Sequence, residues 1–133
     1  MPFPSSTIEI RVRYKEADQM GRVYHSNYLV WYDIARTEFL RQRGCSYKKL
    51  EEEGIFFVVA EVGNKYLGLL EFDDIVLINT TLTEIKNVSV TFSYDCINKT
   101  NGKIVSKGFT KMGIVDKSGK IAKIPQPVLD LLK

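Results

Sequence analysis

A short segment, residues 14–28, holds most of the side chains in this sequence that could do chemistry. It contains two acids, Glu16 and Asp18, the single histidine of the chain, His25, and a turn glycine, Gly21, just before a predicted helix. A helix N-terminus presents unpaired backbone N–H groups and a partial positive charge, which suit an oxyanion that develops on a carbonyl. A carboxylate held opposite such a terminus could attack the carbonyl or activate a water molecule.

The leaving group decides how much further help this chemistry needs. A thiolate departs without strong acid catalysis, because the pKa of its conjugate acid is about 8.5 when cysteine is the reference. A carboxylate opposite a helix end, placed here at His25 and Ser26, could therefore hydrolyse a thioester without a catalytic triad. Simpler roles stay open for the same residues: Asp18 as a turn or capping acid, and His25 as a helix cap or a packed imidazole.

Most other kinds of site find no support in the sequence. The motifs G-x-S-x-G, G-x-x-x-x-G-K and H-E-x-x-H and the dinucleotide glycine fingerprint are absent. Cys45 and Cys96 lie far apart and the chain has one histidine, so neither a zinc site nor a disulfide framework is indicated. We expect no metal and no separate cofactor, and we interpret Cys45 as a small buried side chain rather than a nucleophile.

Length and composition indicate one globular domain over residues 1–133. The net charge is +3, but lysines and arginines are scattered among almost as many acids, so nucleic-acid binding has little support. The first residues lack the features of a signal peptide, and the longest apolar run, residues 55–60, is too short to span a bilayer. We therefore expect a cytoplasmic protein with no membrane span and no nucleic-acid partner.

The elements around residues 14–28 follow from hydrophobic periodicity. Alternation predicts a strand over 7–14 with Tyr14 on its apolar side, and the most regular alternation, over 88–98, predicts a central strand with one buried face. Turn signals at 98–102 and 116–119 indicate antiparallel hairpins. The remaining predicted elements are a long helix over 26–43 that Gly44 ends, a short helix over 47–53 that Ser46 caps, and then strands to the chain end, over 55–67, 72–85 and 104–115.

This order predicts an α+β fold with one antiparallel sheet wrapped around one long helix. The second half of that helix is amphipathic and places Arg36 outward, whereas its first half, residues 28–32, is apolar on all sides. An all-round apolar segment is buried on every side, but the chain's own sheet covers only one. We therefore predict that a second subunit covers the other side; the alternative is a monomer in which Trp31 and its neighbours fill the core.

From Glu16 to Tyr28 the sequence reads E-A-D-Q-M-G-R-V-Y-H-S-N-Y, and Ala35 and Arg36 follow inside the predicted helix. This segment resembles the YbgC-like and 4-hydroxybenzoyl-CoA thioesterases of the hot-dog superfamily. Their pattern is acid-x-Asp-x-x-Gly-x-Val-x-(His or Tyr)-x-Asn-Tyr, followed by a long helix with Ala-Arg. Weaker similarity continues over nearly the whole chain, through residues 58–62, 65–67, 89–94 and 124–125.

The resemblance implies a hot-dog fold, in which five or six antiparallel strands wrap the helix, and hydrolysis of thioesters of coenzyme A or acyl carrier protein. Coenzyme A is then part of the substrate, and active sites lie between the subunits of dimers that pair into tetramers. By the same resemblance Asp18 is the nucleophile or general base, and His25 polarises the carbonyl through its backbone N–H and assists with its side chain. The implied substrate-binding residues are Gly21, Tyr24, Ser26 and Asn27.

Two departures from the family pattern and two other functions remain. Glu16 stands where the family usually has Asp, and Gly68-Leu69-Leu70 replaces a basic-Pro-Ala turn, which changes the expected acyl pocket. A hot-dog hydratase or dehydratase, or a non-catalytic acyl-CoA-binding or regulatory module, would share the fold. The sequence leaves the acyl group open, and also whether the carrier is coenzyme A or acyl carrier protein.

Overall fold

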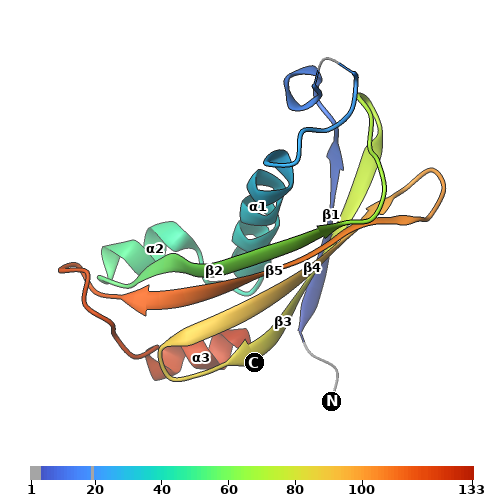
Figure 1. The fold of residues 1–133 in the computed structure, drawn as a ribbon. Coiled ribbons are helices and arrows are strands. Elements are labelled where there is room, and N and C mark those ends of the chain that lie inside the picture. Colours follow the sequence, from blue (N-terminus) through green and yellow to red (C-terminus); the bar gives the residue numbers. More distant parts are fainter. Residues whose placement is uncertain (1–3, 19) are drawn as a thin grey trace.

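One antiparallel sheet wraps around a long helix (Figure 1). The computed structural model describes residues 4–18 and 20–133, so Gln19, which follows Asp18, lies outside the described residues. The strand order is β1-β3-β4-β5-β2, which leaves β1 and β2 at the edges. The predicted α+β architecture is confirmed, with five strands. In chain order the elements are β1 (Ser5–Arg11), the short 3₁₀ helix η1 (Tyr14–Glu16), α1 (Asn27–Gln42), α2 (Tyr47–Glu52), β2 (Phe56–Tyr66), β3 (Ile75–Ile85), β4 (Ser89–Asn98), β5 (Ile104–Val115) and α3 (Gln126–Leu132).

The hydrophobic core lies between the concave face of the sheet and α1. β4 is the central strand and buries one face, as its alternation predicts; the buried side chains include Val90, Phe92, Tyr94 and Cys96. Two aromatic contacts join this face to the helix. Tyr32 stacks on Tyr94 with ring centroids 4.3 Å apart, and Phe39 meets Phe92 edge to face at 5.4 Å. The sheet therefore fixes both the position and the rotation of α1.

Helix α1 buries one face and leaves another open. Its buried side chains recur at the helical spacing of three or four residues and include Tyr28, Trp31, Tyr32, Ala35 and Phe39. Leu29, Val30 and Ile34 on the other side are exposed. The helix ends just before Gly44, whose φ of +76° suits glycine at a C-terminal cap. The apolar segment 28–32 is thus covered by its own sheet on one side only.

The prediction that Arg36 points outward is wrong, because only 4% of this residue is exposed. Its guanidinium donates to the hydroxyls of Tyr47 at 2.8 Å and Tyr94 at 3.1 Å, and it forms an ion pair with Asp33. A guanidinium can be buried when its donors find acceptors. Two of these acceptors come from α2 and β4, so the pattern of the helix alone could not reveal them.

The predicted strand over 7–14 ends early. β1 stops at Arg11, and the chain then turns because the Glu16 N–H donates to the Arg13 carbonyl at 3.0 Å and the Glu16 carboxylate accepts the Arg13 N–H at 2.7 Å. Tyr14, predicted on the apolar side of the strand, is 80% exposed instead. The early end of the strand creates the turn that leads into residues 16–25.

Two further boundaries differ from the predictions. The strand predicted from residue 72 begins at Ile75, because the Asp74 carboxylate accepts the Glu71 N–H at 2.8 Å and forms a turn. The chain end is helical rather than extended: α3 buries Val128 and Leu132, and its seven residues are too few to show a clear helical period.

The short helix α2 is confirmed. Ser46 occupies the N-cap position, and its side-chain oxygen accepts the Lys49 N–H at 3.3 Å. Within residues 4–18 and 20–133, no helix has the length and apolar character that crossing a membrane requires.

Candidate active site

The loop after η1 holds Asp18 in a tight turn. One carboxylate oxygen, Oδ1, accepts the backbone N–H groups of Met20 at 2.8 Å and Arg22 at 3.2 Å, while the Asp18 N–H donates to the Arg22 carbonyl at 2.6 Å. Gly21 completes the turn with a φ of +79°, which glycine adopts at little cost. The other oxygen, Oδ2, has no hydrogen-bond donor in the described part of the chain. Asp18 therefore fulfils a turn role and still presents one oxygen for chemistry.

The start of α1 presents backbone donors that have no partner in the described part of the chain. His25 and Ser26 form a turn directly before the first helical residue, Asn27, whose N–H donates to the Tyr24 carbonyl at 3.0 Å. Among residues 4–18 and 20–133, no acceptor binds the backbone N–H of His25 or Ser26. Ser26 holds the N-cap position, but its side chain makes no capping bond. Both N–H groups thus remain available at the positive end of the helix.

A cavity of about 300 Å³ lies between this loop, the helix start and the connection from β2 to β3. Three predicted site residues meet there: Asp18, Tyr24 and His25. The cavity is lined by Asp18, Val23, Tyr24, His25, Tyr28, Tyr66, Gly68, Leu69 and Leu70.

The other three predicted site residues lie beside this cavity without lining it. Gly21 shapes the turn, and its carbonyl accepts the Phe72 N–H at 3.1 Å. Asn27 uses its side-chain amide to bind the Glu16 carbonyl at 2.9 Å. Ser26 is exposed at the helix N-cap. Gly21 and Asn27 therefore have structural roles in the fold. Their contact with substrate stays a prediction.

The far wall of the cavity is formed by Tyr66, which was not among the predicted site residues, and by Gly68-Leu69-Leu70, whose departure from the family pattern predicted a changed acyl pocket. Tyr66, the last residue of β2, donates its hydroxyl to the His25 carbonyl at 3.2 Å and packs edge to face on Tyr28 at 5.4 Å. Gly68, Leu69 and Leu70 follow after one intervening residue, Leu67. The only signal for these residues in the sequence was their place in, or departure from, the family pattern. They give the cavity a wall of aromatic and aliphatic side chains.

Glu16 lies behind the cavity wall and is 2% exposed. Burial alone would raise the pKa of its carboxyl, but hydrogen bonds from the Arg13 backbone and side chain and from Trp31, with the charge of Arg13, hold that pKa below its usual value. Glu16 is therefore a buried carboxylate at neutral pH. In the sequence Glu16 stood out as one of two acids in the segment 14–28 and as a departure from the family pattern, but nothing there indicated its burial.

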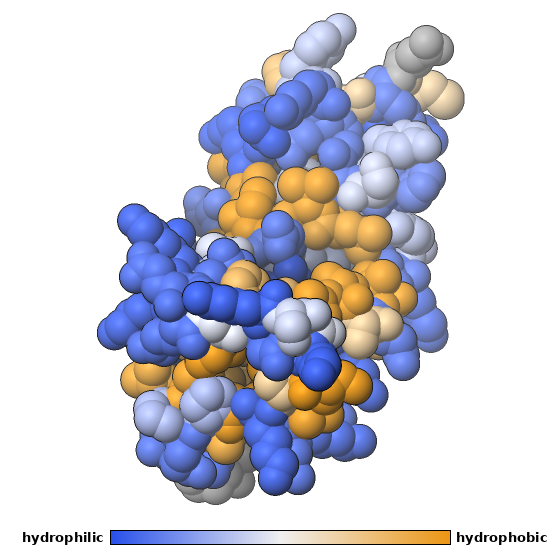
Figure 2. Space-filling model, turned by 90° about the vertical axis from the view of Figure 1, so that its left-hand side faces the viewer, coloured by the Kyte–Doolittle hydropathy of each residue, from blue (hydrophilic) through white to orange (hydrophobic). Residues whose placement is uncertain are grey.

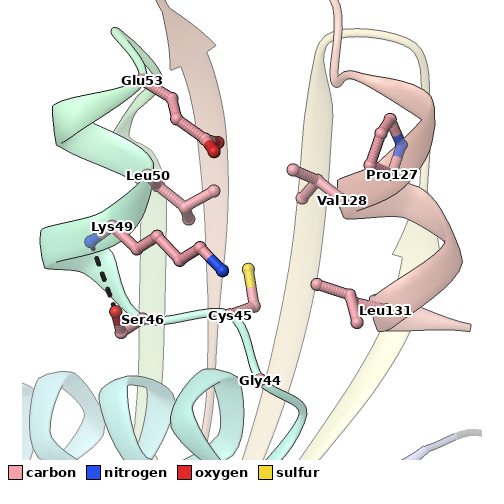
Figure 3. Close-up of a pocket in the computed structure, with 9 residues that line it drawn as sticks. All are labelled: Gly44, Cys45, Ser46, Lys49, Leu50, Glu53, Pro127, Val128 and Leu131. Atoms are coloured by element: carbon pink, nitrogen blue, oxygen red, sulfur yellow. Dashed lines mark hydrogen bonds between the residues drawn. The ribbon is translucent and has the colours of Figure 1, made fainter.

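The cysteines do not supply a second reactive centre. Cys45 borders a cavity of about 110 Å³ between α2 and α3, where Lys49 and Glu53 also lie (Figure 3). Burial and the nearby Glu53 raise the pKa of the Cys45 thiol despite the opposing charge of Lys49. Burial raises the pKa of Cys96 to about 12. Both thiols are thus protonated at neutral pH, which fits the interpretation of Cys45 as a packing residue.

Comparison with known proteins links this arrangement to one family. The sequence matches the thioesterase-like superfamily over residues 12–132. The acyl-CoA thioesterase YbgC of Haemophilus influenzae is 32% identical over 119 residues, which are 89% of this chain and 85% of that protein. A solved structure from Aquifex aeolicus superposes with a TM-score of 0.91 at 35% identity and covers 96% of this chain and 99% of its own.

A solved structure of a DHNA-CoA thioesterase from Staphylococcus aureus also superposes, with a TM-score of 0.85 at 27% identity over 90% of this chain and 80% of that one. The family match spans strands β2 to β5, the long helix and every residue that lines the cavity, whereas β1 lies outside it. The predicted family and the predicted fold are both confirmed. The chain belongs to the thioesterase-like superfamily and has the hot-dog fold.

Proposed function

We propose that this chain hydrolyses acyl-CoA thioesters to a free acid and a thiol, in the cavity between Asp18 and the start of α1. The observation that carries the proposal is that Asp18 and His25 line one cavity at the start of α1. Among the described residues, Asp18 Oδ2 and the backbone N–H groups of His25 and Ser26 have no hydrogen-bond partner. This is the pair of groups that thioester hydrolysis needs. The names of the relatives from Haemophilus influenzae and Staphylococcus aureus support the same substrate class.

In the proposed reaction the thioester carbonyl oxygen accepts the N–H groups of His25 and Ser26. In one route Asp18 Oδ2 takes a proton from water as the water oxygen bonds to the carbonyl carbon. The tetrahedral intermediate then collapses, the C–S bond breaks, and the departing thiolate takes the proton from Asp18, which restores the carboxylate. In the other route Oδ2 bonds to the carbonyl carbon and expels the thiolate, and water hydrolyses the resulting anhydride. Both routes place negative charge on the oxygen that faces the helix end.

The test is thiol release from purified protein with acyl-CoAs of increasing chain length, aryl-CoAs and one acyl carrier protein thioester. We expect catalytic release from at least one coenzyme A thioester, and the panel identifies the acyl group and the carrier. Binding without release would favour a non-catalytic module. Addition of water to the double bond of an enoyl-CoA, without release of the thiol, would favour a hydratase.

We also propose a homodimer that pairs into a tetramer, in the cytoplasm. Strand β2 is an edge strand whose side chains Val58, Val59 and Val62 are exposed, and edges of this kind pair readily with another strand. A groove of about 420 Å³ separates it from the exposed side of α1 at Leu29 and Val30. Figure 2 shows how much apolar surface a single chain leaves exposed on one side. A second copy would cover this groove and the open side of α1.

We expect light scattering at micromolar concentration to give the mass of a dimer or tetramer. Val62→Lys places a charge in the groove and should shift the mass toward the monomer with loss of thiol release. Val88→Lys is the matched control, because Val88 is an exposed valine outside the groove, and it should leave the mass unchanged. A wild-type protein that is monomeric, folded and fully active would contradict the proposed assembly.

A further inference from the structure

We infer that Glu16 is the positioning residue of this site: it sets the separation between the Asp18 carboxylate and the N–H groups at the start of α1. The inference rests on the proposed function for its kinetic consequence. Glu16 precedes Asp18 by two residues and does not line the cavity, so it acts through the groups that it holds.

The side chain of Glu16 connects the turn to α1 at Trp31. Its Oε2 accepts the indole N–H of Trp31 at 2.7 Å and a guanidinium N–H of Arg13 at 3.2 Å. Its Oε1 accepts the Arg13 backbone N–H at 2.7 Å. The carboxylate therefore links Arg13, which precedes the turn, to Trp31, which lies in the core.

The backbone of Glu16 ties the same turn to the helix start. Its carbonyl accepts the Tyr24 N–H at 3.0 Å and the Asn27 side-chain amide at 2.9 Å. Tyr24 directly precedes His25, and Asn27 is the first residue of α1. Glu16 thus contacts the residues directly before and directly after His25 and Ser26, which carry the two N–H groups. Asp18 lies only two residues after Glu16.

The contacts require an acceptor at both carboxylate oxygens. The indole N–H, the guanidinium and the backbone N–H can only donate, so each oxygen of Glu16 faces donors alone. Glutamine has one acceptor, and in either orientation its NH₂ group would point at another donor. Glu16→Gln should therefore disturb the turn while nearly preserving the volume of the side chain.

A small displacement of the turn matters because the carboxylate and the N–H groups act on one carbonyl. Misplacement by about 1 Å can lower the rate about 10²-fold. We expect Glu16→Gln to lower kcat about 10–100-fold with KM changed less than about threefold, since the cavity walls that contact the acyl group stay in place. The measurement is steady-state thiol release on the best substrate.

Two further variants separate positioning from general loss of stability. Trp31→Phe keeps a ring but removes one of the donors, so kcat of the double variant Glu16→Gln/Trp31→Phe should equal or exceed that of Glu16→Gln alone. Tyr94→Phe is the matched control: it removes a buried hydroxyl that binds Arg36 and Thr110, far from the turn in sequence. It should lower the melting temperature and leave kcat unchanged.

Amide hydrogen exchange tests the structural effect of Glu16→Gln independently of enzymatic activity. In Glu16→Gln the amides of residues 16–27 should exchange faster than in the wild type, and in Tyr94→Phe they should not. If the wild type is active and Glu16→Gln keeps kcat within about twofold, the positioning role is overturned and the thioesterase proposal stands. If the wild type releases no thiol from any substrate, the thioesterase proposal fails. In that case, if the amides of residues 16–27 exchange equally fast in Glu16→Gln and in the wild type, the role of Glu16 in holding the turn is overturned as well.

Discussion

We expect Asp18→Asn to lower kcat for acyl-CoA hydrolysis by about 10²–10⁴-fold, the usual contribution of a general base. The asparagine oxygen can still accept the N–H groups of Met20 and Arg22, which Asp18 Oδ1 accepts now, so the turn should keep its shape. The second position becomes an NH₂ group, which is neither nucleophile nor base. Because the loss falls on the transition state, KM should change little.

His25→Ala is the companion variant and should be milder than Asp18→Asn. The backbone N–H at position 25 survives the change, and Tyr66 can still bind the carbonyl of that residue. Steady-state thiol release by both variants, with circular dichroism to establish folding, makes the comparison. A folded Asp18→Asn protein with near-wild-type turnover would return Asp18 to a turn role and remove the proposed mechanism.

The second large effect is expected for Trp31→Ala, which should cost about 3–5 kcal/mol of unfolding free energy. Trp31 is fully buried, packs on Tyr28 at 5.1 Å between ring centroids and donates its indole N–H to Glu16 at 2.7 Å. Truncation leaves a cavity beside α1 and removes one donor from a buried carboxylate. The expected fall in melting temperature is about 10–20 °C for a domain of this size.

Thermal unfolding followed by circular dichroism measures this loss, and the mass of the assembly should be measured on the same sample. Val88→Ala is the matched control, because Val88 is exposed and lies outside the groove that a second copy would cover, so its truncation should leave neither an internal cavity nor a gap at the interface. Trp31→Ala with unchanged melting and unchanged mass would contradict the packing described for α1.

The sequence determined the main elements of this fold. The period-2 alternation in β4 and the helical stretch that Gly44 ends depend on neighbouring residues, so they can be read along the chain. The family pattern from Glu16 to Tyr28 likewise predicted a site around Asp18 and His25; these two residues line one cavity, and their roles stay predictions. Such signals are local, because periodicity and turn chemistry are set within a few residues.

The tertiary structure decided everything that depends on distant partners. Glu16 and Trp31 are 15 residues apart, and Arg36 is buried only because hydroxyls 11 and 58 residues further on reach it. The same holds for the cavity wall at Tyr66, which binds the carbonyl of a residue 41 positions earlier. A polar side chain reads as exposed in a local pattern, since nothing in its neighbourhood shows the acceptor or donor that compensates its burial. The sequence therefore indicated which residues could react, and the packing of β2, β4 and η1 against α1 decided how they are held.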